Sequence, residues 1–82
     1  MTHLILQNVS LYDNLKRLRT DAGLSQKALV VKMNLLGSKI TRNTYTKIEL
    51  GIRNIKVTDL VALKQVYGVD YAEFFKDIPT HE

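Results

Sequence analysis

The chain has 82 residues and a mass of 9.4 kDa, with 45% hydrophobic and 24% charged side chains. This length gives one small domain with a thin core, which excludes a multidomain enzyme. The sequence contains no cysteine. Disulfides, thiolate metal sites and cysteine nucleophiles are therefore excluded, which is consistent with a reducing compartment.

Apolar runs are short throughout the sequence. The longest are residues 28–31 and 60–63, far below the roughly 20 apolar residues that cross a bilayer. Near the start of the chain, Leu4, Ile5 and Leu6 form a short run with no basic stretch before it. We therefore expect neither a membrane span nor a secretory signal, and we predict a cytoplasmic protein.

The formal net charge of +4 is unevenly distributed along the chain. Residues 1–26 carry three basic and two acidic side chains, residues 27–56 carry seven and one, and residues 57–82 carry two and five. The positive charge is thus concentrated in the middle third. Such a segment attracts polyanions such as nucleic acid, although lysine-rich surfaces also serve solubility alone.

Glycine follows each stretch of helical spacing in the first 68 residues, at positions 23, 37, 51 and 68. Glycine after a helix is typical of a left-handed C-cap. No alternation of apolar and polar residues indicates a strand, and no hairpin signal occurs. The sequence therefore predicts an all-α fold of five helices with short connections.

The first two helices are predicted from their start signals and apolar stripes. Ser10 is the expected N-cap of the first helix, with Asp13 favourably placed in its first turn. The second helix is expected to begin after Ser25 and to end at Gly37. The residues predicted to face inward are Leu11, Leu15, Leu18 and Ala22 in the first helix and Leu29, Val30, Met33 and Leu36 in the second.

The third helix has the clearest start. Thr41 is its expected N-cap, because Ile40 before it and Tyr45 four residues after it have the spacing of a hydrophobic staple. Ile48 continues the same apolar face. We expect Tyr45 to belong to the core rather than to a stacking surface, and we expect the same of Tyr67 in the fourth helix.

The last two helices follow after residue 55. The fourth is predicted over residues 57–67, with a cap among residues 56–58 and with Val57, Leu60, Leu63 and Tyr67 facing inward. Asp70 and Glu73 have the spacing of a capping box at the start of the fifth helix. Val69 and Phe74 are the corresponding staple.

The segment over residues 41–49 has the composition of a helix that reads DNA. Helical spacing places Arg42, Asn43, Thr46 and Lys47 on the side opposite Tyr45 and Ile48. Arginine and lysine suit the O6 and N7 atoms of guanine, and asparagine suits N6 and N7 of adenine. The alternative is that these are ordinary solvated side chains, although a cation in a first helical turn opposes the helix dipole.

At this point the chain resembles the helix-turn-helix domains of the Cro and phage-repressor type, the Xre group of bacterial and phage regulators. The resemblance covers about residues 11–75. It rests on an ordered set of short motifs: Leu15-Lys16-Arg17-Leu18-Arg19, Gly23-Leu24-Ser25-Gln26, Leu29, Tyr45-Thr46-Lys47-Ile48-Glu49, Gly51, Arg53, Leu60, Leu63, Gly68-Val69 and Phe74-Phe75. It implies a five-helix lambda-repressor-like domain over residues 10–76, between an N-terminal extension (1–9) and a C-terminal tail (77–82).

The resemblance also implies roles for individual residues. Helices two and three would form the helix-turn-helix, with Arg42, Asn43, Thr46 and Lys47 reading bases. Residues expected to bind DNA phosphates are Ser25, Gln26, Lys39, Thr41, Arg53, Asn54 and Lys56. Gln26 would also brace the recognition helix. Arg19 and Glu49 match a partly buried ion pair that joins the first and third helices.

The sequence departs from the family pattern in the connection before the third helix. Residues 33–41 make this connection about five residues longer than usual, although Gly37 and the Ile40-Thr41-Arg42 step resemble a longer variant of the family. Val30 and Lys64 replace small residues that are common in the family. We expect local repacking there, with Lys64 extending its amine to solvent.

Other signals are weak. His3 and His81 have no cluster of further ligands, so we expect no metal site, no cofactor and no enzymatic activity. The apolar residues at the start of the chain (Leu4, Ile5, Leu6 and Val9) are expected either to cover their own subunit or to join a dimer contact, as are Phe74, Phe75 and Ile78 at the other end.

The leading hypothesis is a sequence-specific DNA-binding regulator, a repressor or autoregulator, that acts as a homodimer on double-stranded DNA. One alternative is a protein-interaction module, such as an antitoxin or small antagonist on the same scaffold. A second alternative is nonspecific binding of nucleic acid, including RNA.

Overall fold

The computed structural model describes residues 9–78. Four α-helices follow one another, α1 (Val9–Asp21), α2 (Gln26–Leu35), α3 (Arg42–Glu49) and α4 (Val57–Tyr67), and a short 3₁₀ helix, η2 (Tyr71–Phe75), completes the order. These residues contain no strand, so the prediction of an all-α class is confirmed. The expected roles of His3, Leu4, Ile5, Leu6 and His81 concern residues outside this range.

The predicted fifth helix is wrong, because residues 71–75 form a 3₁₀ helix rather than an α-helix. The side chain of Asp70 makes no capping hydrogen bond, so the predicted capping box is also absent. Five residues between the turn after Gly68 and the extended Lys76 are too few for an α-helix to gain from its ladder of hydrogen bonds. The staple residue Phe74 is nevertheless fully buried, with Val69 packed against the core.

Helix α1 differs from the prediction at its start. Ser10 lies inside the helix and is therefore not its N-cap. Leu15 and Leu18 are buried as predicted, Leu11 packs against the core, and Ala22 is exposed. Burial in α1 also extends to Tyr12 and Asn14, which lie beside the predicted stripe.

Helix α2 begins as predicted after Ser25, whose hydroxyl accepts a hydrogen bond from the Ala28 amide at 3.0 Å. Leu29, Val30 and Met33 are buried. Leu36 is half exposed, against the prediction, because the helix ends at Leu35 and Leu36 is its C-cap.

Helix α4 has the predicted bounds and ends at Gly68, which has the left-handed φ of 65° that favours glycine. Its buried face differs from the prediction. Val57 is 76% exposed, whereas Asp59 and Ala62 are buried beside Leu63. Helix α4 packs against α2, and its first residue, Val57, lies on the exposed side of the helix.

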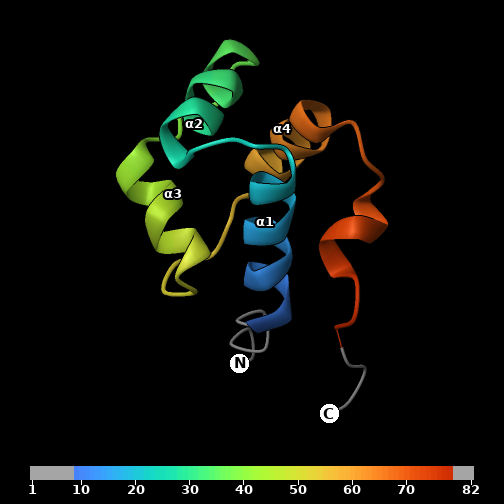
Figure 1. The fold of residues 1–82 in the computed structure, drawn as a ribbon. Coiled ribbons are helices and arrows are strands. Elements are labelled where there is room, and N and C mark those ends of the chain that lie inside the picture. Colours follow the sequence, from blue (N-terminus) through green and yellow to red (C-terminus); the bar gives the residue numbers. More distant parts are fainter. Residues whose placement is uncertain (1–8, 79–82) are drawn as a thin grey trace.

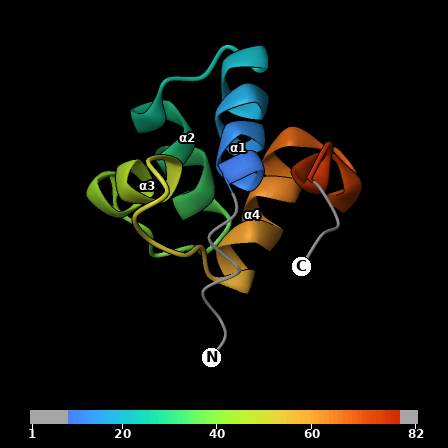
Figure 2. The ribbon, with the colours of Figure 1, turned by 90° about the horizontal axis from the view of Figure 1, so that it is seen from below.

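Helix α1 contacts α3 on one side and η2 on the other (Figure 1). The view along α1 separates the same two sides, with α3 and η2 at opposite edges of the molecule (Figure 2). Helix α2 packs against both α3 and α4. The core between them consists of fully buried side chains from every element: Leu15, Leu29, Met33, Tyr45, Ile48, Leu63 and Phe74.

Tyr45 is fully buried, and Tyr67 packs partly buried against the core, so both tyrosines have the predicted structural role. No helix within residues 9–78 is long and apolar enough to cross a membrane.

Candidate nucleic-acid interface

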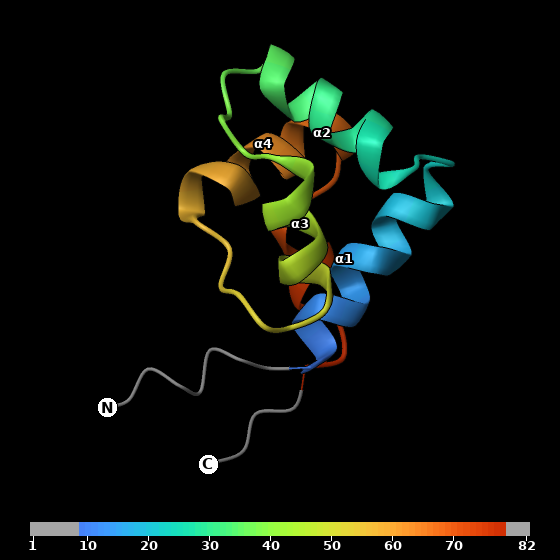
Figure 3. The ribbon, with the colours of Figure 1, turned by 90° about the vertical axis from the view of Figure 1, so that its left-hand side faces the viewer.

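Helix α3 lies at the surface, and one side of the molecule is formed largely by this helix and the loop that follows it (Figure 3). The hydroxyl of Thr41 caps the helix by accepting a hydrogen bond from the Thr44 amide at 3.2 Å. Ile40, Tyr45 and Ile48 are buried, as the staple predicts. The helix is therefore anchored by one face, and its opposite face is available for contact.

The four predicted base-reading residues lie on this available side or at its edge. Arg42 and Asn43 are exposed in the first turn, while Thr46 and Lys47 are half-buried one turn later. An exposed cation and an exposed amide at the N-terminal end of a surface helix can donate and accept hydrogen bonds at base edges.

A polar network fixes the other end of α3 to α1. Arg19 donates two hydrogen bonds to Glu49, from Nε to Oε2 at 2.6 Å and from Nη2 to Oε1 at 3.1 Å. The side chains of Arg19 and Glu49 are only 12% and 5% exposed. Tyr45 Oη also donates to Glu49 Oε2 at 2.7 Å. The ion pair that the family resemblance implies is thus present, with a two-pronged geometry that fixes the angle between the helices.

The network changes the pKa values of its members. Burial alone would raise the pKa of Glu49, but hydrogen bonds from Arg19, Tyr45 and Gln26 outweigh burial, so its pKa lies below the ordinary value. The hydrogen bond to Glu49 raises the pKa of Arg19 despite desolvation. Burial, and then the hydrogen bond to Glu49, raises the pKa of Tyr45. Both members of the ion pair are therefore charged at neutral pH.

Gln26 connects the start of α2 to α3. Its Nε2 donates to Glu49 Oε1 at 3.2 Å, and its Oε1 accepts a hydrogen bond from Thr46 Oγ1 at 2.5 Å. Thr46 therefore uses its hydroxyl proton within the protein and has only lone pairs left for a ligand. This contact gives Gln26 the geometry of a brace on the recognition helix.

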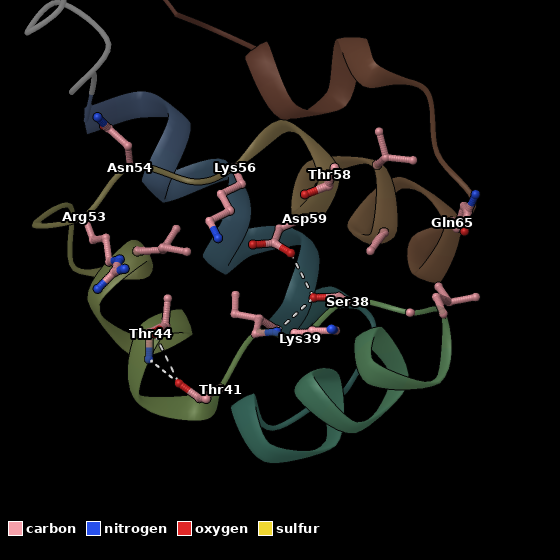
Figure 4. A pocket seen from close by; sticks show the side chains of 16 residues that line it. Ser38, Lys39, Thr41, Thr44, Arg53, Asn54, Lys56, Thr58, Asp59 and Gln65 are labelled. Carbon is pink, nitrogen blue, oxygen red and sulfur yellow. Dashed lines mark hydrogen bonds between the residues drawn. The ribbon is translucent and has the colours of Figure 1, made fainter.

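Most of the remaining predicted phosphate-binding residues meet around one groove. The groove has a volume of about 760 Å³ and lies between α3 and α4. Its lining includes Lys39 from the α2–α3 turn, Thr41 from the cap of α3, and Arg53, Asn54 and Lys56 from the α3–α4 loop (Figure 4). Two segments, the α2–α3 turn and the α3–α4 loop, thus bring three cations to one surface.

Ser25 and Gln26 lie apart from this groove, at the N-terminus of α2. Gln26 touches α3 through Thr46, whereas the groove reaches the helix at Thr44. Helical spacing places Thr44 and Thr46 on different flanks of α3. The two sets of predicted phosphate contacts therefore flank α3 on both sides.

Three residues in this region were missed by the sequence analysis, namely Asn34, Ser38 and Asp59. Asn34 and Ser38 form hydrogen bonds within the long α2–α3 turn, and Ser38 also binds the buried carboxylate of Asp59 in α4. An acidic residue in a first helical turn is commonly explained by the helix dipole alone. Only the tertiary contact reveals the additional partner.

One comparison with known proteins agrees with this fold. A family model described as helix-turn-helix matches residues 15–74, well over half of the chain. The chain belongs to this helix-turn-helix family. The family is of the Cro and phage-repressor type, so the resemblance found in the sequence is confirmed. No curated protein and no solved structure gave a significant match.

Membership of the helix-turn-helix family makes the chain a DNA-binding domain of a regulatory class. The family is not typically enzymatic. Within residues 9–78, no group of three or more histidine, cysteine, aspartate or glutamate side chains could hold a metal ion.

Proposed function

We propose that the protein is a sequence-specific transcriptional regulator, a repressor or autoregulator, that places α3 in the major groove of double-stranded DNA. One observation carries this proposal. The polar first turn of α3 is exposed, while its last turn is fixed to α1 and α2 by the bonds of Glu49 to Arg19 and Gln26. A reading helix must be both accessible and rigidly held.

Base recognition is assigned to Arg42, Asn43 and Lys47, with Thr46 contributing an acceptor. Arg42 and Asn43 lie at the end of α3 that enters the groove first in this class of domain. Arginine and lysine recognise guanine through O6 and N7, and asparagine recognises adenine through N6 and N7.

Phosphate binding is assigned to the two flanks of α3. Ser25 and Gln26 would hold one strand at the N-terminus of α2, where the helix dipole favours an anion. The other strand would be held at the groove by Lys39, Thr41, Arg53, Asn54 and Lys56. These contacts position the protein, whereas the first turn of α3 discriminates sequence.

We further propose that two copies bind together. One short reading helix contacts too few base pairs for strong specificity, so regulators of this kind read two half-sites about one helical turn apart. A regulator that acts on a chromosome works in the cytoplasm of its host, bound to the nucleoid, and we place this protein there in a bacterium or a phage-infected cell.

A second candidate function is a protein-interaction module, such as an antitoxin or a small antagonist. The observation that favours it is an apolar surface at the end of α2, where Leu35 is 82% and Val31 is 51% exposed. Contiguous exposed apolar side chains are typical of interaction sites. Binding of a protein there would be compatible with DNA binding by α3.

The proposal is tested by selecting bound fragments from a pool of random and genomic duplexes. We expect the wild-type protein to enrich an inverted repeat, and the double variant Arg42→Ala, Asn43→Ala to lose this enrichment. Lys76→Ala is the matched control, since it removes an exposed cation near η2, on the opposite side of α1. Enrichment of no sequence by the wild type would favour the protein-interaction module.

The salt dependence of DNA affinity gives an independent test of how many phosphates the protein contacts. With about four phosphate contacts per subunit, a dimer should show a slope near −7 in a plot of log affinity against log salt concentration, at roughly −0.9 per contact. We expect Lys56→Ala to make this slope shallower without changing the preferred sequence. A wild-type slope near −2 would contradict the two-flank arrangement.

A further inference from the structure

The long turn between α2 and α3 is held by side chains rather than by regular secondary structure. Its first hydrogen bonds return to the end of α2, from the Gly37 amide to Asn34 O at 3.0 Å and from the Ser38 amide to Met33 O at 3.1 Å. The turn then continues through Lys39 and Ile40 to the cap of α3. Its path in this second part depends on Asn34, Ser38 and Asp59.

Asn34 ties the turn to α2. Its side-chain Nδ2 donates to the carbonyl of Ser38 at 2.9 Å and to the carbonyl of Ile40 at 3.0 Å. One amide thus satisfies two carbonyls of a loop that has no ladder partner. The distance between the end of α2 and the start of α3 is fixed by this bridge.

Ser38 ties the turn to α4. Its Oγ donates to Oδ1 of Asp59 at 2.8 Å and accepts from the Ile40 amide at 3.1 Å (Figure 4). Asp59 is only 8% exposed and lies in the first turn of α4. A hydrogen bond to a buried carboxylate is stronger than one between neutral groups, so this contact is a firm anchor.

The anchor acts on the start of α3, because Ile40 immediately precedes the N-cap Thr41. The last turn of α3 is held separately by Glu49. A helix of eight residues is about 12 Å long. If the Ser38–Asp59 contact were lost, α3 would still be held at Glu49, and Arg42 and Asn43 at the free end would move most.

The charge of Asp59 argues against a direct role in binding DNA. It is the one acidic side chain in the lining of a groove that also contains Lys39, Arg53 and Lys56. A carboxylate repels phosphate, so Asp59 opposes the attraction of these cations. Its burial and its bond to Ser38 are explained by a role inside the protein.

We propose that Ser38 and Asp59 are positioning residues for DNA recognition, which fix the first turn of α3 at the angle that base contacts require. This inference deepens the proposed function and rests on it. Neither residue touches a base; they act through Ile40 and Thr41 on Arg42 and Asn43. The long turn therefore supports the reading surface from below.

The test measures the ratio of affinities for the selected operator and for a random duplex at one salt concentration. We expect Ser38→Ala and Asp59→Ala to lower this ratio about tenfold, the effect of losing roughly one base contact. Affinity for the random duplex should stay the same or rise slightly for Asp59→Ala, because the groove cations remain. Asp59→Asn should retain most of the ratio, since its amide oxygen can still accept from Ser38.

The matched control is Asn14→Ala. Asn14 is also buried, and its side chain holds the opposite side of the molecule through bonds to the carbonyls of Phe74 and Lys76. We expect this variant to lose stability but to keep the affinity ratio. An equal loss of ratio in Asn14→Ala would show that Ser38 and Asp59 act only through global stability and would overturn the proposal.

A second measurement needs no DNA. Residual dipolar couplings of backbone amides report the orientation of α3 relative to α1 in the free protein. We expect a rotation of α3 in Ser38→Ala that Asp59→Asn does not show. An unchanged orientation together with an unchanged affinity ratio would refute the positioning role. If the wild type selects no DNA sequence, the proposed function fails, and the couplings alone then decide whether Ser38 and Asp59 position α3.

Discussion

The two sides of α1 are closed by different kinds of polar contact. Toward α3, side chain meets side chain: Arg19 of α1 donates to Glu49, which also accepts from Tyr45 within α3 and from Gln26 of α2. Toward η2, the hydrogen bonds join side chains to backbone, with Asn14 donating to the carbonyls of Phe74 and Lys76 at 2.9 and 2.8 Å, and a looser, partly exposed ion pair joins Arg17 to Glu73 at 3.6 Å. Arg17 likewise donates to the carbonyl of Glu73 at 3.0 Å.

The two kinds of polar contact differ in how precisely they fix the neighbouring element. A backbone carbonyl is available from any residue, so Asn14 can close the η2 side with little demand on the side chains there. The α3 side needs a carboxylate at position 49, a guanidinium at position 19 and an amide at position 26. Such a network fixes one orientation, which a reading helix requires and a closing segment does not.

The largest loss of stability is expected from a variant that breaks the contacts on the α3 side of α1. Glu49→Ala removes the acceptor of four hydrogen bonds and leaves Arg19 with an uncompensated charge in a largely buried position. We expect a loss of about 3–5 kcal/mol in the free energy of unfolding. Urea denaturation measures this loss directly. Asn14→Ala should cost less, about 1–3 kcal/mol, since it loses two bonds to backbone carbonyls and one long bond from Arg17 without leaving a buried charge unpaired; equal losses would contradict the comparison.

The next effect concerns the loop after α3. Gly51 has a φ of 80°, and a Cβ at this position would lie 2.9 Å from Cδ2 of Tyr12 in α1. We expect Gly51→Ala to destabilise the protein by about 2–4 kcal/mol through backbone strain and this clash.

Gly23 is the matched control for Gly51, because it has a φ of 71° and nothing within 4 Å of a built Cβ. Gly23→Ala should therefore cost only the backbone strain, about 1–2 kcal/mol. Thermal unfolding of both variants measures the difference. Equal costs would show that Tyr12 yields to the new methyl group without loss.

A smaller effect is expected from pH. The folded pKa of Glu49 lies below its ordinary value of 4.5, so the unfolded chain binds the proton first as the pH falls. The stabilisation that this carboxylate provides is complete above pH 4.5 and is lost as the pH falls through the folded pKa.

Urea denaturation over a pH series tests this dependence. The stability difference between the wild type and Glu49→Gln should shrink in acid, whereas the difference for Asn14→Ala should stay constant, because its contacts do not titrate. A constant difference for Glu49→Gln would contradict the charged network.

The smallest effect is expected at Tyr67, which lies between the two regions. Its ring is 6.5 Å from that of Phe74, and burial, together with the charge of Glu49, raises the pKa of its hydroxyl. That hydroxyl is buried without a hydrogen-bond partner among residues 9–78. Tyr67→Phe should leave the free energy of unfolding unchanged or raise it by up to about 1 kcal/mol. A clear destabilisation would reveal a hydrogen bond of this hydroxyl.

Local signals predicted the helices well where cap and apolar spacing agreed. The Thr41 cap and the burial of Ile40, Tyr45 and Ile48 required only contacts within a few residues. The same rules failed at Ser10, Leu36, Val57 and Asp70, each at or near the end of an element. Apolar spacing does not show at which residue a helix begins or ends. Whether a residue near that boundary is a cap, buried or exposed is therefore decided by the neighbouring elements.

The candidate site also has features that local sequence signals predict and features that depend on tertiary packing. The sequence by itself determined the all-α class, the polar composition of the first turn of α3 and the concentration of positive charge in the middle third, because periodicity, caps and charge are local properties. The helix-turn-helix class followed from the resemblance of its ordered motifs to a known family. Only the tertiary structure decided that Lys39, Arg53 and Lys56 line one groove and that Ser38 binds Asp59. Those contacts join residues far apart in the chain, and their geometry depends on how the helices pack.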